Sequence, residues 1–141
     1  MMALAVTTVR LPWSTGEAWL LAAVLLATGL GKALDLPGFA QILETYRLFP
    51  TGSEGLAAAS VTAAELFLAA GLIVPSWRRR AAGLAALFFL ANAALLSVTL
   101  LRGIDLPNCG CFGAFLARPL RVWTPLEDLA LMAAATLARG R

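Results

Sequence analysis

Residues 81–101 read AAGLAALFFLANAALLSVTLL, a run that contains no charged side chain. A helix that spans a bilayer needs about 20 predominantly apolar residues. Three arginines, residues 78–80, stand directly before the run and mark where it leaves the membrane. The stretch therefore predicts a transmembrane helix over residues 80–101.

Three further apolar runs have a suitable length, at residues 15–34, 54–74 and 124–139. Of the 141 residues, 60% are hydrophobic and only 13% are charged, and average proteins are much less apolar. A soluble domain of this size cannot bury so much apolar surface. We predict an all-α integral membrane protein, a four-transmembrane-helix bundle that forms a single domain over residues 1–141.

The first run also has features of a cleaved signal peptide, because Arg10 precedes an apolar core. However, the run is long, and no convincing small-x-small cleavage site precedes Lys32. The sequence therefore favours a retained span.

Large apolar residues recur three and four positions apart between the first two predicted spans, at Phe39, Ile42, Leu43, Tyr46 and Phe49. This spacing places them on one face of a helix, with polar residues on the other faces. The helix is too short to span a bilayer. We predict a short amphipathic helix lying in the membrane interface.

The short loop between the second and third predicted spans carries Arg78, Arg79 and Arg80. Positively charged loops stay in the cytoplasm. Both termini are then cytoplasmic, and the amphipathic helix shares the outer face with residues 103–123. We expect a multi-pass protein of the bacterial inner (cytoplasmic) membrane, with residues 103–123 facing an oxidising compartment.

The only two cysteines, Cys109 and Cys111, lie one residue apart within PNCGCFG, residues 107–113. A disulfide between them closes a very small ring, far from usual disulfide geometry, and Gly110 supplies the backbone freedom that such a ring needs. The Pro, Asn and Gly neighbours indicate an exposed turn. Strained, exposed disulfides exchange readily, so we predict a catalytic redox dithiol.

Three other interpretations of the pair remain open. A structural disulfide between neighbours would constrain almost no chain. A zinc site needs about four ligands, and a chain without histidine or a third cysteine offers only part of one. The third alternative is two inert buried thiols, which an exposed turn disfavours.

Glu65 and Asn92 each lie about ten residues from the outer end of a predicted span, hence both about 15 Å below the outer surface. An ionisable group at this depth is a functional-site hypothesis by default. Oxidation of a dithiol releases two electrons and two protons, and a quinone is the simplest acceptor for a chain without histidine to hold haem. We predict that Glu65 and Asn92 bind a quinone oxygen. The alternative is a protonated Glu65 that bonds Asn92 and joins two helices.

Three other charged residues receive no site role from the sequence. Lys32, near the outer end of the first span, is expected to snorkel to the surface. Glu127 and Asp128 fall in the first turn of the last span, where the helix dipole favours acidic side chains and Thr124 with Glu127 matches a capping box.

Several pieces occur in order along nearly the whole chain: Gly31-Lys32-x-x-Asp35, Gly38-Phe39, Tyr46-Arg47-Leu48-Phe49-Pro50, Glu65 and Cys109-Gly110-Cys111-Phe112-Gly113. They resemble the MauE family, the methylamine-utilisation membrane proteins of the DoxX-like superfamily. The resemblance implies a four-helix membrane bundle associated with periplasmic disulfide handling. It also implies maturation of a disulfide-rich dehydrogenase subunit alongside a thioredoxin-like partner. Relatives often carry an Arg-Asp pair where this chain has Glu127-Asp128, so the role of that arginine does not transfer.

These observations predict a membrane thiol–disulfide oxidoreductase that exchanges electrons between Cys109/Cys111 and a thioredoxin-fold periplasmic protein. Arg102, Arg118 or Arg121 is suited to stabilise a thiolate. One alternative is a non-catalytic membrane anchor that recruits the thioredoxin-fold protein, and another is a metal-handling membrane protein. The lipid bilayer is the other expected partner, and the sequence holds no nucleic-acid motif.

Overall fold

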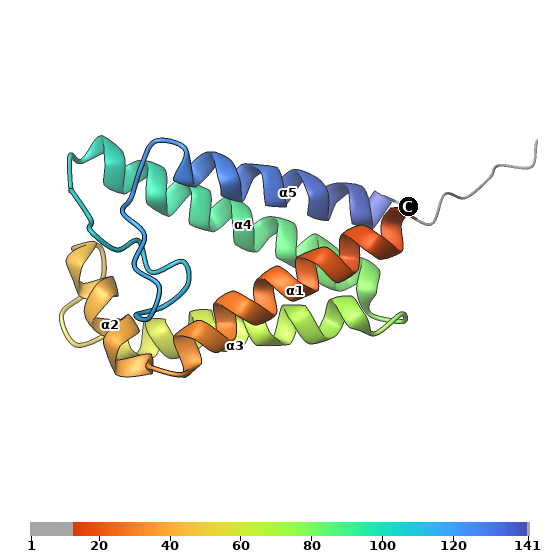
Figure 1. Ribbon diagram of the computed structural model, residues 1–141, viewed down its shortest axis with the longest axis horizontal. Helices are drawn as coiled ribbons and strands as arrows, with labels where there is room; N and C mark the ends of the chain where they lie inside the picture. The colour runs from red at the N-terminus through yellow and green to blue at the C-terminus, as the bar shows by residue number, and fades with distance from the viewer. Residues whose placement is uncertain (1–12, 141) are drawn as a thin grey trace, which may run out of the picture.

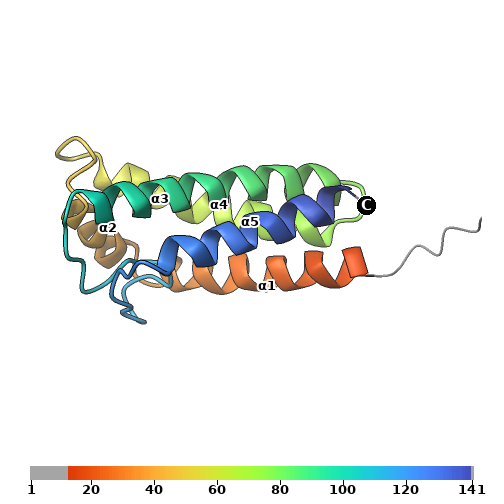
Figure 2. The same cartoon turned by 90° about the horizontal axis from the view of Figure 1, so that it is seen from above.

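The computed structural model describes residues 13–140. Over this range the chain forms five helices: α1 (Trp13–Ala33), α2 (Leu36–Thr45), α3 (Glu54–Ile73), α4 (Arg78–Leu101) and α5 (Thr124–Gly140). The four long helices lie side by side, and α2 lies across one end (Figures 1 and 2). Contacts of α1 with α3, α3 with α4, α4 with α5 and α5 with α1 close the bundle. The predicted all-helical fold is confirmed.

Three of the long helices are long and apolar enough to cross a membrane: Thr15–Ala33 within α1, α3 and α4. Helix α5 has 17 residues, so it is about 25 Å long, shorter than the roughly 30 Å of a hydrocarbon core. Many large apolar side chains face outward from the bundle, including Leu20, Leu84 and Leu101. This outer surface suits lipid. The chain is a helical membrane protein, and a fourth span through α5 stays a prediction.

Helix ends follow local sequence signals. Asp35 caps α2, because its Oδ1 accepts a hydrogen bond from the backbone N of Gly38 (2.9 Å), and Pro37 occupies the first turn, where a missing N–H costs nothing. Helix α3 ends at Ile73, shortly before Pro75, as expected for a residue that cannot continue a helix. These helix boundaries are therefore set by residues within a few positions along the chain.

The interior of the bundle is built largely from alanines, in particular Ala18, Ala22, Ala69, Ala81, Ala82, Ala85 and Ala86. Small side chains allow helix backbones to approach closely, which is how helices associate in lipid. Gly71 is an extreme case, since a Cβ there would lie 2.8 Å from the Cβ of Ala81. The small residues thus set the spacing of α3 and α4.

Helix α2 forms where the sequence predicts it, but its apolar face contacts protein. Phe39, Leu43 and Tyr46 are buried in a second core with residues of the loop that follows α4, and α2 also contacts α3. The prediction of an amphipathic helix is confirmed. The side chains expected to face lipid instead cover the end of the bundle.

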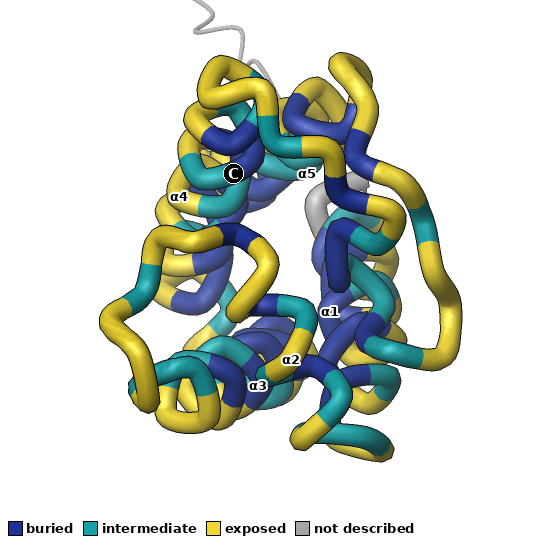
Figure 3. The backbone as a smooth tube through the Cα atoms, turned by 90° about the vertical axis from the view of Figure 1, so that its left-hand side faces the viewer, coloured by how far each residue is buried: buried dark blue, intermediate teal, exposed yellow. Residues whose placement is uncertain are grey.

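Residues 103–123, called here the cysteine loop, fold back onto the bundle. The backbone N of Cys109 donates to the carbonyl of Arg118 (2.7 Å), and the backbone N of Leu120 donates to the carbonyl of Leu106 (2.9 Å). These two bonds hold the two halves of the loop side by side. Buried and exposed stretches alternate along it (Figure 3). The expectation of an exposed turn is wrong for Cys109, of which only 4% is exposed.

Two glycines permit this docking. A Cβ on Gly31 of α1 would lie 2.5 Å from the carbonyl oxygen of Phe112, and a Cβ on Gly113 would collide with the carbonyl of Gly31. Gly113 also has φ +79°, a conformation that favours glycine. The loop backbone therefore rests directly on the backbone of α1.

Helix α2 and the cysteine loop lie at one end of the bundle, and the arginine-rich turn between α3 and α4 lies at the other (Figure 1). The arrangement agrees with the predicted two-sided topology. At the cysteine end, Arg102 donates to the carbonyls of Tyr46 (3.0 Å) and Arg47 (3.1 Å). That arginine therefore ties α4 to the end of α2, which explains a positive charge on the side predicted to be outside.

Candidate functional site

A cavity of about 130 Å³ lies inside the cysteine end of the bundle and is lined by all five helices and the cysteine loop. It brings together the four residues singled out from the sequence, Cys109, Cys111, Glu65 and Asn92. The lining of the cavity is mostly apolar, and Glu65, Asn92 and Asp128 are among its polar side chains. The predicted site residues therefore share one chamber, although they come from three separate segments.

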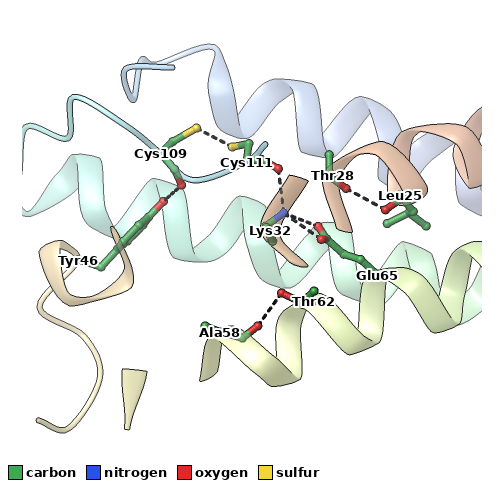
Figure 4. Close-up of polar contacts among 9 residues, drawn as sticks. All are labelled: Leu25, Thr28, Lys32, Tyr46, Ala58, Thr62, Glu65, Cys109 and Cys111. Carbon is green, nitrogen blue, oxygen red and sulfur yellow. Dashed lines mark hydrogen bonds and ion pairs between the residues drawn. The ribbon is translucent and has the colours of Figure 1, made fainter. Parts of the chain in front are cut away.

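The two cysteines are free thiols in this structure, and their sulfurs lie 2.7 Å apart (Figure 4). Gly110 between them has φ +74°, the left-handed region in which a residue without Cβ is at ease. Cys109 is buried, whereas Cys111 is half-buried. The two sulfurs are thus in contact, and Cys111 is the more exposed residue of the two.

Hydrogen bonds hold the backbone around the pair. The hydroxyl of Tyr46 donates to the carbonyl of Cys109 (2.5 Å). The side chain of Asn108 accepts from the backbone N of Gly110 (2.9 Å) and donates to the carbonyl of Gly113 (3.3 Å). These bonds account for the Asn and Gly residues that flank the cysteines. They fix the conformation of the turn.

The two thiols have different proton affinities. The hydrogen bond from the Cys111 thiol lowers the pKa of Cys109 to about 6 against the opposing effect of burial, and the nearby charge of Arg118 lowers it further. The same hydrogen bond, together with burial, raises the pKa of Cys111. One proton is therefore shared between the sulfurs, and the pair holds a single thiolate at neutral pH. Of the three arginines considered from the sequence, Arg118 is the one that acts on the pair.

The reduced protein should be alkylated by neutral iodoacetamide with a pH midpoint near the Cys109 pKa of about 6. The thiolate is the nucleophile, so the rate should fall as the pH is lowered through this value and stay flat above it. An unperturbed thiol has its midpoint near pH 8.5. Stopped reactions analysed by mass spectrometry give the profile. The Cys109→Ser variant should lose the low midpoint, and a wild-type midpoint above about pH 8 would contradict the shared-proton arrangement.

Lys32 and Glu65 form a buried ion pair beneath the cysteines (Figure 4). The Lys32 ammonium donates to both carboxylate oxygens of Glu65 (2.8 and 2.9 Å) and to the carbonyl oxygen of Cys111 (2.8 Å). The two residues are only 4% and 3% exposed. The prediction that Lys32 snorkels to the surface is wrong. All three ammonium protons are used inward, and one of them holds the cysteine loop.

Asn92 lines the same cavity from α4, but within residues 13–140 no hydrogen bond joins its amide to Glu65. The carboxylate has Lys32 as its partner instead. The alternative in which a protonated Glu65 bonds Asn92 and joins two helices is therefore wrong in its choice of partner. Quinone binding by the two residues stays a prediction.

Helix α5 contributes two acidic residues that the sequence analysis set aside. Glu127 accepts two hydrogen bonds from Arg118 (2.9 and 3.0 Å), so its side chain braces the cysteine loop and does not close a capping box. Asp128 lines the cavity. Their placement in a first helical turn is explained equally well by the helix dipole, and no signal in the sequence separates the two roles.

The pairing of Lys32 with Glu65 escaped the sequence analysis for a geometric reason. Lys32 is one residue from the end of α1, whereas residues 54 to 65 of α3 cover about 16 Å. The two can meet only because α3 extends past the end of α1, beside α2. Opposite charges in neighbouring spans are the signal that the sequence offers, and they do not reveal the stagger of the two helices.

A sequence profile described as "Methylamine utilisation protein MauE" matches residues 12–139. A curated relative, "Methylamine utilization protein MauE" of Paracoccus denitrificans, is 31% identical over 115 residues. The matched region is 82% of this chain and 62% of the relative, so the chain spans less than two thirds of that protein's length. No solved structure matches the chain significantly.

Proposed function

Because this chain belongs to the MauE family, we propose that it is a membrane thiol–disulfide oxidoreductase that serves the maturation of secreted disulfide-containing proteins. Its Cys109/Cys111 pair would exchange electrons with a thioredoxin-fold protein on the outer face of the bacterial inner membrane. The observation that carries the proposal is the contact of two thiols, 2.7 Å apart, in a braced loop above a charged cavity. The name of the relative from Paracoccus denitrificans makes methylamine utilisation the first pathway to consider.

The two cysteines have different roles in the proposed exchange. In the oxidising direction, a substrate thiolate attacks the Cys111 sulfur of the disulfide, because Cys111 is the more exposed of the two. The sulfur–sulfur bond breaks and Cys109 leaves as a thiolate. A thiol with a lowered pKa is the better leaving group, and the pKa of Cys109 is about 6.

The second substrate thiolate then attacks the mixed disulfide and releases Cys111. The substrate has gained a disulfide, and the Cys109/Cys111 pair has gained two electrons. A buried cysteine is poorly placed to attack a substrate, whatever its pKa. Both the burial of Cys109 and its low pKa suit a leaving and resolving thiol.

Oxidised protein treated briefly with excess glutathione, then acid-quenched and alkylated, should carry glutathione on Cys111 and the alkyl group on Cys109. The physical reason is the difference in access combined with the difference in leaving-group pKa. Tandem mass spectrometry of the peptide that contains both cysteines distinguishes the two isomers. Glutathione found mainly on Cys109 would reverse the assignment, and failure to form any intramolecular disulfide under air would remove the mechanism.

The double variant Cys109→Ser/Cys111→Ser distinguishes the redox proposal from the alternative of a non-catalytic membrane anchor. An anchor that recruits its thioredoxin-fold partner by packing would support maturation of a secreted disulfide protein with both thiols absent. The redox proposal requires maturation to be lost while the variant still accumulates in the membrane.

We propose that the reduced pair passes its electrons to a quinone held by Glu65 and Asn92. The cavity of about 130 Å³ is close to the ~150 Å³ of an apolar cavity known to hold benzene, so its size is in the range of a single ring. A quinone accepts two electrons and two protons. In this arrangement the Asn92 amide donates to a ring oxygen, and the Lys32–Glu65 pair lies beside the cysteines to exchange protons.

The Asn92→Leu variant should retain less quinone through purification and reoxidise its dithiol about fivefold to tenfold more slowly, as expected for one lost hydrogen bond. Asn92 is a cleaner test than Glu65, since Glu65→Gln would also leave Lys32 without its ion partner. Solvent extraction and chromatography measure the quinone, and the thermal unfolding temperature serves as the control. Unchanged quinone content with a lowered unfolding temperature would assign Asn92 to packing alone.

A further inference from the structure

A groove with a volume of about 810 Å³ lies between α4 and α5 at the end opposite the cysteine loop. Arg79, Arg80 and Arg139 line it at the ends of the two helices, and Leu84, Leu87 and Leu90 line it farther along α4. The groove shares no residue with the cavity below the cysteines. Neither the redox proposal nor the quinone proposal uses it.

The three arginines meet from two helices. Arg79 and Arg80 stand in the first turn of α4 and Arg139 in the last turn of α5. Gly83 makes room for the third, since a Cβ at that position would lie 3.2 Å from Cδ of Arg139. Within residues 13–140 the ion pairs involve Lys32 with Glu65 and Arg118 with Glu127, both at other places. The positive charge at the groove therefore has no carboxylate counterpart in the described chain.

Below the arginines the groove is apolar and open. Leu84, Leu87 and Leu90 are spaced three residues apart and are 49%, 64% and 45% exposed. They extend about 9 Å along α4, toward the middle of the bundle. A groove with positive charge at its mouth and an apolar strip parallel to the helix axes matches a molecule with an anionic head and a long apolar tail, oriented along the membrane normal.

We propose that this groove binds an anionic phospholipid, with the phosphate between Arg79, Arg80 and Arg139 and an acyl chain along the leucine strip. Guanidinium groups are well matched to phosphate oxygens. Basic recesses on the cytoplasmic side of membrane helices bind anionic headgroups. The lipid would hold together the ends of α4 and α5, which bring Arg79, Arg80 and Arg139 to this groove.

The test uses the purified full chain in a neutral detergent, with phosphatidylglycerol and phosphatidylcholine as probes and native mass spectrometry as the readout. Phosphatidylglycerol should bind on the order of a hundredfold more tightly than phosphatidylcholine, because each of three arginines near an anionic headgroup contributes about a factor of five. The variant Arg79→Gln/Arg80→Gln/Arg139→Gln should lose that preference. Arg47→Gln/Arg121→Gln, which neutralises exposed arginines at the other end, should keep it.

The single variant Arg139→Gln provides the same test if the triple variant does not fold, with a smaller expected loss of about fivefold. Leu87→Gln, which alters the strip and leaves the charge, should weaken phosphatidylglycerol retention as well. Equal binding of the two lipids, or an unchanged preference in the folded arginine variants, would overturn the proposal. Complete displacement of the lipid by millimolar inorganic phosphate would also overturn it, because the groove would then be a free-anion site.

Discussion

Replacing Lys32 by methionine is expected to destabilise the protein by about 3–5 kcal/mol, the cost of leaving one member of a buried ion pair without its partner. The carboxylate of Glu65, which is 3% exposed, would then have lost its ion-pair partner. The carbonyl of Cys111 would also lose its donor. Thermal unfolding of the purified variant in detergent measures the loss.

The matched control is the double variant Lys32→Met/Glu65→Leu. An apolar pair of similar volume often replaces a buried ion pair without loss, so the double variant should recover most of the stability that Lys32→Met loses. Its cysteine loop should remain less firmly held, because the bond from Lys32 to Cys111 is absent in both variants. A double variant as unstable as the single one would mean that Lys32 matters mainly through the loop.

The Gly113→Ala variant is expected to release the cysteine loop from α1. A Cβ at this position collides with the carbonyl of Gly31, and backbone atoms cannot rotate away as a side chain can. Alanine also resists φ +79°, which costs about 1–2 kcal/mol. Alkylation of the buried Cys109 should become faster, and dithiol exchange with a protein partner should fall, because the preorganised turn is lost.

Gly103→Ala is the control for backbone strain alone. Gly103 has φ +68°, yet a Cβ there meets nothing within 4 Å. The two variants therefore share the dihedral penalty and differ only in the collision with α1. If both change Cys109 alkylation equally, the close approach of the loop to Gly31 has no functional consequence.

These two predictions concern one structural unit. Lys32 and Gly31 are consecutive residues of α1, and both contact the cysteine loop, one by a hydrogen bond and the other by direct backbone contact. From the opposite side, Tyr46 holds Cys109 and Glu127 holds Arg118. The cysteine loop is thus fixed by α1, by the end of α2 and by α5 together. A change at any of these contacts should alter the dithiol without touching a sulfur.

The sequence by itself determined the membrane class, the positions of the helices and the identity of the dithiol. These features depend on local quantities: the length of apolar runs, the proline after α3, the Asp35 cap and the spacing of two cysteines. Each of them acts within a few residues along the chain. Composition alone also excluded a soluble fold, because the interior of a domain of this size cannot bury so many apolar side chains.

The tertiary structure alone decided which charges meet. Lys32 reaches Glu65 because α3 extends beyond α1, and that stagger follows from how α2 packs across the end of the bundle. Cys109 is buried because it packs against Phe39 and Leu43 of α2. The loop also touches the backbone of α1 at Gly31 and Gly113, although each glycine by itself is compatible with an ordinary helix or turn. Asp128 lines the cavity through the rotation of α5 about its axis. Stagger, rotation and backbone contact arise between segments distant in sequence, so no local pattern records them.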